Sequence, residues 1–205
     1  MTLRVLPLLA FVVAPAPALA HHVGTYTPQD NELTTNFKQV KFSVQAGKFD
    51  VARRLFEAGA LRAQMRAKAA TLPPGLESGT RAALQAGDAP EVERRLMIFF
   101  AALARDLALE AGRQLVDARL APEARATAGP RFLEAIWRYY NLIDFAVAMR
   151  DDKTSVAMRL AFDEAEGYAK AAAPAGAGLS DALRRIAQIL THLIDTSSTF
   201  ARRNP

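Results

Sequence analysis

The chain has 205 residues, of which 51% are hydrophobic, 23% charged and 8% aromatic, and its formal net charge at pH 7 is +5. This hydrophobic content is ordinary for a globular protein and too high for a disordered chain. The sequence contains no cysteine and only three histidines, His21, His22 and His192. These counts exclude disulfides, thiolate metal centres and cysteine nucleophiles, and they leave little room for an all-histidine metal site or a catalytic triad.

Residues 1–20 have the pattern of a signal peptide. One cation, Arg4, precedes an apolar run that is too short to span a bilayer. A stretch of small residues and prolines follows, and Ala18 and Ala20 fit the small-residue rule for signal-peptidase cleavage. We therefore expect cleavage after Ala20, a mature chain that begins at His21, and a periplasmic or secreted location.

The remaining sequence gives no sign of a membrane or nucleic-acid partner. No later segment is long and apolar enough to cross a bilayer. The cations are scattered among acidic residues along Ala-rich stretches and form no basic patch interleaved with aromatic residues. We expect no transmembrane segment in the mature chain and no nucleic-acid partner.

Apolar residues recur at helical spacing through residues 28–200, and no alternating strand pattern occurs. This periodicity predicts a single all-α domain, an antiparallel helical bundle or helical-hairpin stack of about six to seven helices. An extended segment, 21–27, is expected before it and a short tail, 201–205, after it, with a flexible Ala/Gly-rich linker at about 171–178. The expected helices cover about 28–46, 49–71, 76–86, 90–120, 130–150, 153–172 and 180–198.

Turn residues set the expected helix boundaries. Thr27 can cap the first helix and Pro28 suits its first position. The Pro-Pro-Gly run at 73–75 is expected to end the second helix. The residues of the second helix that we expect to face the core are Val51, Leu55, Ala58 and Met65.

Two segments repeat part of the sequence. Gln-Ala-Gly at 45–47 recurs at 85–87, and Val-Ala-Arg-Arg-Leu at 51–55 has a counterpart, Val-Glu-Arg-Arg-Leu, at 92–96. The offset of 40 to 41 residues suits a helical-hairpin repeat, and the segment 46–59 resembles the inter-helix turn of a tetratricopeptide repeat. Two partial copies leave open whether the chain contains a true repeat array.

The mature N-terminus is the first candidate metal site. After cleavage, the α-amine and the imidazole of His21 can chelate one ion, and two nitrogen donors favour copper(II). His22 adds another imidazole. The arrangement resembles the N-terminal half of the histidine brace of copper enzymes and copper carriers. A complete brace would need His192, which helical spacing places opposite the apolar stripe of the last helix, so we expect His192 to face solvent.

Acidic side chains near the apolar stripes of three helices are the second candidate. We expect Glu110 to project into the stripe of the fourth helix and Asp144 to flank that of the fifth. Asp163 is expected on the same side of the sixth helix as Val156 and Leu160. Carboxylates on facing helices can hold iron inside a bundle, although the usual Glu-x-x-His motifs are absent. Ion pairs with neighbouring arginines are the other interpretation.

These observations leave three functions open. The first is an exported, periplasmic metal-handling protein that binds copper at the mature N-terminus or iron through helix carboxylates. The second is a non-catalytic helical interaction module that holds a protein partner in the cell envelope, and the third is a copper-dependent oxidoreductase. The stretch from Trp137 to Glu166 is similar in architecture to the helical extracytoplasmic modules of bacterial iron permeases. No phosphate loop, nucleophile elbow or zinc-protease motif occurs, which argues against an enzyme.

Overall fold

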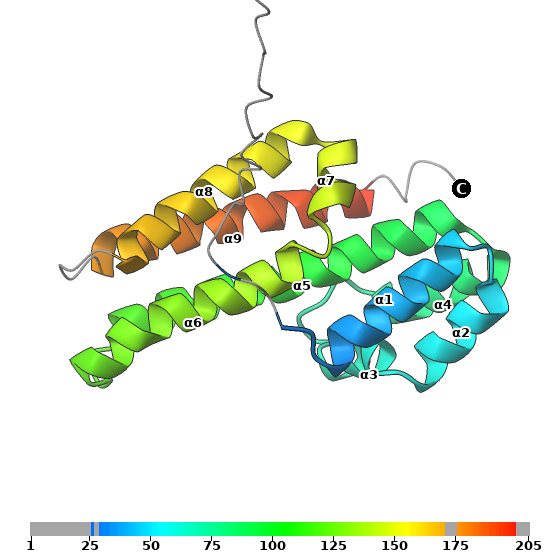
Figure 1. The fold of residues 1–205 in the computed structure, drawn as a ribbon, viewed down its shortest axis with the longest axis horizontal. Coiled ribbons are helices and arrows are strands. Elements are labelled where there is room, and N and C mark those ends of the chain that lie inside the picture. Colours follow the sequence, from blue (N-terminus) through cyan, green and yellow to red (C-terminus); the bar gives the residue numbers. More distant parts are fainter. Residues whose placement is uncertain (1–25, 27–28, 171–175, 200–205) are drawn as a thin grey trace, which may run out of the picture.

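A computed structural model describes residue 26, residues 29–170 and residues 176–199. Within these residues the regular elements are all helices, which confirms the all-α fold class (Figure 1). The expected signal peptide, residues 1–20, and the tail, 201–205, lie outside the described residues. The helices are α1 (Glu32–Gln45), α2 (Phe49–Ala58), α3 (Ala60–Ala67), α4 (Leu76–Ala86), α5 (Ala89–Val116), α6 (Pro122–Tyr140), α7 (Asp144–Arg150), α8 (Asp152–Lys170) and α9 (Gly176–Thr199).

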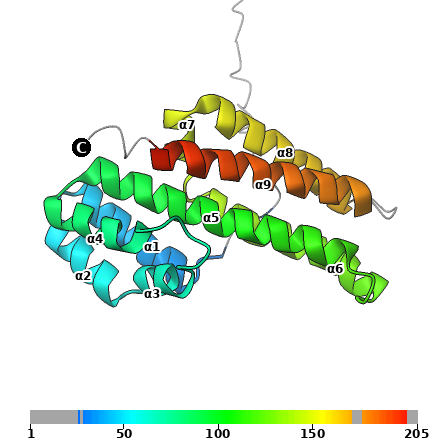
Figure 2. The ribbon, with the colours of Figure 1, turned by 180° about the vertical axis from the view of Figure 1, so that it is seen from behind.

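Four long helices, α5, α6, α8 and α9, form an elongated bundle. Helix α5 packs most extensively against α9 and α6, and α8 packs against α9. The pairs α5–α6 and α8–α9 are antiparallel hairpins, and α1 to α4 gather around the N-terminal half of α5, as the view from behind also shows (Figures 1 and 2). This arrangement agrees with the antiparallel packing that short connections predict. The described residues form nine helices rather than six to seven, because two expected helices are divided.

The expected helix over 49–71 is divided at Gly59, whose backbone is extended. The buried side chain of Asn36, on α1, bonds the backbone groups that the division frees. Its Nδ2 donates to the carbonyl of Leu55 at 3.1 Å, and its Oδ1 accepts from the N–H of Leu61 at 2.9 Å. One side chain thus satisfies both the end of α2 and the start of α3. Helix α3 ends at Ala67, short of the expected 71.

The predicted core face of α2 was wrong by one position. Ala52 and Phe56 are fully buried, whereas Val51 and Leu55 are half-buried and Ala58 is exposed. The predicted stripe, Val51 and Leu55, and the buried stripe, Ala52 and Phe56, are both apolar. Burial of the Phe56 ring removes the larger area from water. Met65, on α3, is buried as predicted.

The second division lies within the expected helix over 130–150. Helix α6 begins at Pro122, continues through Pro130 and ends at Tyr140, and a turn over 141–143 separates it from α7. Proline suits the first turn of a helix, and Pro122 takes that position here. The helix was expected to begin at about residue 130, so its predicted start was wrong by eight residues.

Helix α1 begins at Glu32 and residues 29–31 are not helical, so the helix expected from residue 28 starts later; Thr27 and Pro28 themselves lie outside the described residues. The side chain of Asn31 accepts from the N–H of Thr34, and the Thr34 hydroxyl oxygen accepts from the N–H of Asn31, both at 2.9 Å. This capping box lies directly before the apolar stripe and fixes the helix start there. The stripe is buried as the periodicity predicts, at Leu33, Phe37, Val40 and Val44.

The two Gln-Ala-Gly segments form turns of the same geometry. Gly47 and Gly87 have φ values of 69° and 70°, which lie in the left-handed region. In each turn the next residue, Lys48 or Asp88, donates its N–H to the carbonyl five residues earlier, at 2.8 and 3.0 Å. These are Schellman-type helix ends. The repeated Gln-Ala-Gly segments therefore mark two equivalent helical hairpins, α1–α2 and α4–α5.

Equivalent core positions in the two hairpins are 40 residues apart. Ala52 corresponds to Val92 and Phe56 to Leu96, and all four are buried. The repeated Val-x-Arg-Arg-Leu segments are 41 residues apart. They are therefore shifted by one residue relative to the core positions, which is about 100° of rotation on a helix. The turns are therefore equivalent in structure, and the Val-x-Arg-Arg-Leu segments are not.

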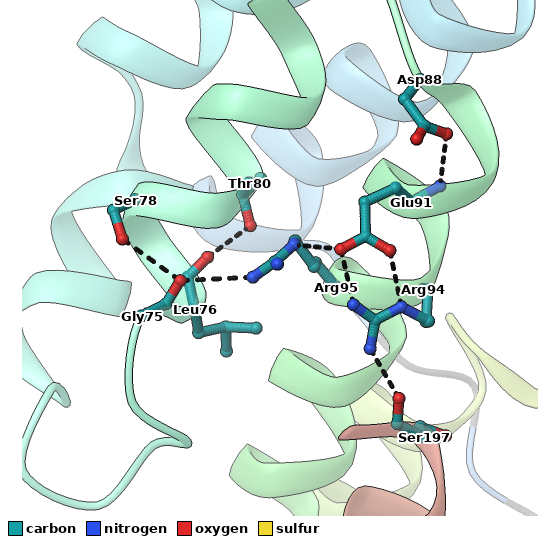
Figure 3. A network of polar contacts seen from close by, with 9 residues as sticks. All are labelled: Gly75, Leu76, Ser78, Thr80, Asp88, Glu91, Arg94, Arg95 and Ser197. Atoms are coloured by element: carbon teal, nitrogen blue, oxygen red, sulfur yellow. Dashed lines mark hydrogen bonds and ion pairs between the residues drawn. The ribbon is translucent and has the colours of Figure 1, made fainter. Parts of the chain in front are cut away.

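A polar network joins the start of α5 to α4 and α9 (Figure 3). The carboxylate of Glu91 accepts hydrogen bonds from Arg94 at 2.5 and 2.7 Å and from Arg95 at 2.6 Å. Arg94 is buried and also donates to the carbonyl of Ser197 at 2.6 Å, in the last turn of α9. Arg95 donates to the carbonyl of Gly75 at 3.2 Å, directly before α4. The hydrogen bond from Arg94 lowers the pKa of Glu91.

Candidate functional site

The predicted copper ligands His21 and His22 lie outside the described residues. His192 is exposed on α9, as its helical position predicted. Tyr26 packs edge-on against Phe162 of α8, with ring centroids 6.3 Å apart. Burial raises the pKa of Tyr26, and the nearby carboxylates of Glu134 and Glu166 raise it further. This tyrosine, five residues after His21, therefore lies against α8 beside two acids that the sequence prediction did not select.

Glu110 lies at the edge of α5 rather than in its buried stripe. Its side chain is 37% exposed, pairs with Arg113 at 2.5 Å and accepts from Gln114 at 2.8 Å. It lines an open cleft of about 580 Å³ between α3, α5 and α6. The other acid of that cleft, Asp106, pairs with Arg105 at 2.7 Å. The carboxylates of this cleft are thus held by arginines, which is the alternative that the sequence left open.

Asp144 begins α7 and links it to α8. Its carboxylate pairs with Arg159 and accepts from the Ser155 hydroxyl at 3.0 Å. Tyr140 is fully buried close by, and burial raises its pKa, with the negative charge of Asp144 acting in the same direction. Asp144 was expected to flank the apolar stripe of one helix over 130–150, but that helix is divided before Asp144, and the contacts found there are an ion pair and a hydrogen bond between α7 and α8.

Asp163 lies on the outward face of α8. It shares this face with Val156 and Leu160, as predicted, but these side chains are 56% and 64% exposed. The buried face of α8 is formed instead by Met158 and Phe162 among others. A helix bundle buries one face of α8, and the larger Phe162 ring is on the face that packs inward.

The structure does not gather the three predicted carboxylates. Among the described residues, no group of three or more histidine, aspartate or glutamate side chains is placed to hold a metal ion. Glu110, Asp144 and Asp163 come from three different helices and have the separate surroundings given above. The carboxylate interpretation of iron binding therefore gains no support from these positions.

An apolar groove lies between α1, α5 and α7 and is called here the α1–α7 groove. Its volume is about 160 Å³. Buried Phe37, Met97 and Ile143 contribute to its lining, and Phe145 and Met149 of α7 stand beside them. The remaining lining residues are Lys41, Gln45, Glu93, Leu96, Leu142, Ala146 and Arg150.

Helix α7 carries large apolar side chains on two sides. Ile143, just before it, and Val147 are buried, whereas Phe145 and Met149 are 74% and 72% exposed. A single exposed hydrophobic residue is ordinary, but two of this size one turn apart beside a groove are not. The run Phe-Ala-Val-Ala-Met at 145–149 is the sequence signal that could have shown this, because a short helix at the edge of a bundle buries only one side.

Two cations stand at the α1–α7 groove, one on each wall. Lys41 is on α1, with its ammonium 5.8 Å from the centroid of the Phe37 ring, and Arg150 is the last residue of α7. Glu93, on α5, is the acidic residue of the lining. None of the three forms an ion pair within the part of the chain that the structure describes.

No family model matches this chain, and comparisons with curated proteins and with solved structures gave no significant match. None of the helices in the described ranges combines the length and apolar character that a membrane span requires.

Proposed function

We propose that this chain is an exported, non-catalytic helical interaction module that binds a protein partner of the cell envelope in the α1–α7 groove. The observation that carries the proposal is the pair Phe145 and Met149, which are about three-quarters exposed and stand one helical turn apart beside the groove. Complete burial of one such side chain is worth about 1.5–3 kcal/mol. A partner that covers both gains a substantial hydrophobic contribution to binding.

The expected export of the chain supplies the cellular setting. It rests on the charged start, apolar run and small-residue end of residues 1–20. A partner must then be available outside the cytoplasm. The absence of enzyme motifs from the sequence supports a binding role over a catalytic one.

Site-specific photo-crosslinking in the native host tests this proposal. A photoreactive residue at position 149 should give one discrete product with an exported protein, and Phe145→Ser should remove that product. The same residue at position 160 is the matched control, because Leu160 is similarly exposed on α8 but does not line the groove. Equal crosslinking from both positions, or none from position 149, would contradict the proposal.

Copper handling at His21 is the second candidate function. The observation that favours it is the pair His21-His22, which directly follows the expected cleavage site. Its test is a copper titration of the mature chain, which does not depend on the groove.

A further inference from the structure

Building on the proposed function, we propose that the segment bound in the α1–α7 groove is an acidic amphipathic helix of the partner. Three properties of the groove carry this inference: the helical spacing of its walls, the exposed apolar pair on α7, and two cations at its sides that form no ion pair with the described residues.

Helical ridges form the walls of the groove. On α1 the lining residues Phe37, Lys41 and Gln45 are spaced four apart, so they form one ridge about 12 Å long. On the facing wall, Phe145 and Met149 are also four apart. Ridges of this kind accept the side chains of another helix, which pack into the grooves beside them. A groove of about two helical turns matches the contact face of a short amphipathic helix.

The apolar part of the occupant follows from the lining. Phe145 and Met149 offer contacts at two points one turn apart, and the buried Met97 lies on the α5 side of the groove. Leucine or similar residues at spacings of three and four on the partner helix would meet these side chains together. Methionine adapts to different apolar shapes, so Met149 tolerates some variety among them.

The acidic character of the proposed partner helix follows from the charged side chains at the groove. Lys41 and Arg150 approach the groove from opposite walls, and neither is neutralised by a carboxylate of the described chain. Among the described residues that line the groove, Glu93 is the one acidic residue beside two cations, so this lining has a positive charge balance. A helix with carboxylates on both sides of its apolar stripe would pair with both cations. A basic helix would meet repulsion from both walls.

The probes are two labelled helical peptides of about 18 residues, about 27 Å long. Both carry leucine at i, i+3, i+4 and i+7, and glutamate fills the flanking positions in one and lysine in the other. Fluorescence anisotropy of the full mature protein at low salt should show that the glutamate peptide binds about tenfold or more tightly than the lysine peptide. Added salt should reduce this preference.

Variants separate the charge contribution from the apolar one. Lys41→Ala and Arg150→Ala should each weaken binding of the glutamate peptide by about two- to fivefold, and Glu93→Gln should strengthen it by a similar factor. Phe145→Ser and Met149→Ser should weaken binding of both peptides. Arg131→Ala and Leu160→Ser are the matched controls, because both residues are exposed on helices that do not line the groove.

Each other outcome identifies a different occupant and overturns the inference. Equal or tighter binding of the lysine peptide rejects the acidic helix. A dimer in sedimentation analysis that Phe145→Ser abolishes would assign the groove to a second copy of the chain. Binding to anionic vesicles with no binding of either peptide would assign it to a lipid surface.

The inference and the proposed function fail in different ways. If position 149 crosslinks to an exported protein but the peptides show no charge preference, the interaction function stands and the acidic helix is wrong. If the glutamate peptide binds as expected but no crosslink forms in the host, the groove has the stated specificity and the cell-envelope role is wrong.

Discussion

The side chain of Asn36 occupies the space that a β-carbon on Gly59 would need. A β-carbon built on Gly59 would overlap Oδ1 and Nδ2 of Asn36 and the carbonyl oxygen of Leu55. The same carboxamide makes the two hydrogen bonds that end α2 and begin α3. The division of the expected second helix therefore depends on the small residue Gly59, between α2 and α3, and on the polar residue Asn36, far from it in the sequence on α1.

Gly59→Ala should lower the free energy of unfolding by roughly 1–3 kcal/mol, because Asn36 must move and leave buried backbone groups without partners. Urea denaturation measures this change. Gly112→Ala is the matched control, since Gly112 lies within α5, four residues before its last residue Val116, and a β-carbon there meets nothing within 4 Å. Alanine in a helix interior is favoured over glycine by about 0.5–1 kcal/mol, so this variant should be more stable than the parent. Equal effects of the two substitutions would contradict the packing described.

The contact between Asn36 and Gly59 is an example of a feature that the sequence alone did not predict. The periodicity gave the all-α class, the buried stripes of α1 and α9 and the turns at Gly47 and Gly87 correctly. It missed the division at Gly59 because the reason lies in a side chain from another helix. Local pattern does not report such long-range contacts.

The positions of the candidate site residues could be predicted only where the buried face of each helix was predicted correctly. Two neighbouring apolar stripes compete on α2 and on α8, and in both helices the packed face contains the larger aromatic residue, Phe56 or Phe162. Val156 and Leu160 lie on the exposed face of α8, and Asp163, which shares that face, is therefore exposed as well. The groove was not predicted, because the sequence indicates one apolar helix over 130–150, whereas the structure divides it before α7 and leaves Phe145 and Met149 exposed.

The Glu91 network should make stability fall in acid. Hydrogen bonding from Arg94 lowers the pKa of Glu91 below its ordinary value of 4.5, so the folded state binds this proton less readily than the unfolded state. The resulting stabilisation is complete above about pH 4.5 and is lost as the pH falls through the lowered pKa. Urea titrations at a series of pH values should show a smaller acid loss in Glu91→Gln than in the parent. An unchanged acid profile in this variant would show that Glu91 contributes nothing to it.

Asp144 and Glu110 should differ in their effect on stability. Asp144→Ala should cost roughly 1–3 kcal/mol, because it removes the acceptor of Ser155 and the partner of Arg159 from a mostly buried position. Glu110→Ala should cost less than about 1 kcal/mol, since its pair with Arg113 is exposed. Thermal unfolding with and without iron adds a further check. An iron-dependent rise in melting temperature that Asp144→Ala abolishes would contradict a purely structural role.

Copper binding at the mature N-terminus remains a prediction of the sequence. A chain that begins at His21 should bind one copper(II) ion through its α-amine and imidazole, and binding should weaken as the pH falls because protons compete for both nitrogens. Competition titration and copper electron paramagnetic resonance measure this. One extra residue before His21, or His21→Ala, should weaken the site, whereas His192→Ala should leave it unchanged. Equal affinity of the extended and native N-termini would rule the site out.

The most direct test of the α1–α7 groove uses the methionines as reporters. Met149 and Met97 line the groove, whereas Met65 and Met158 are buried elsewhere. In protein labelled with ¹³C-methyl methionine, titration with the glutamate peptide should shift the Met149 and Met97 signals in nuclear magnetic resonance spectra and leave those of Met65 and Met158 in place. Peptide binding that leaves Met149 unshifted, or that shifts all four signals equally, would contradict a docking site between α1 and α7.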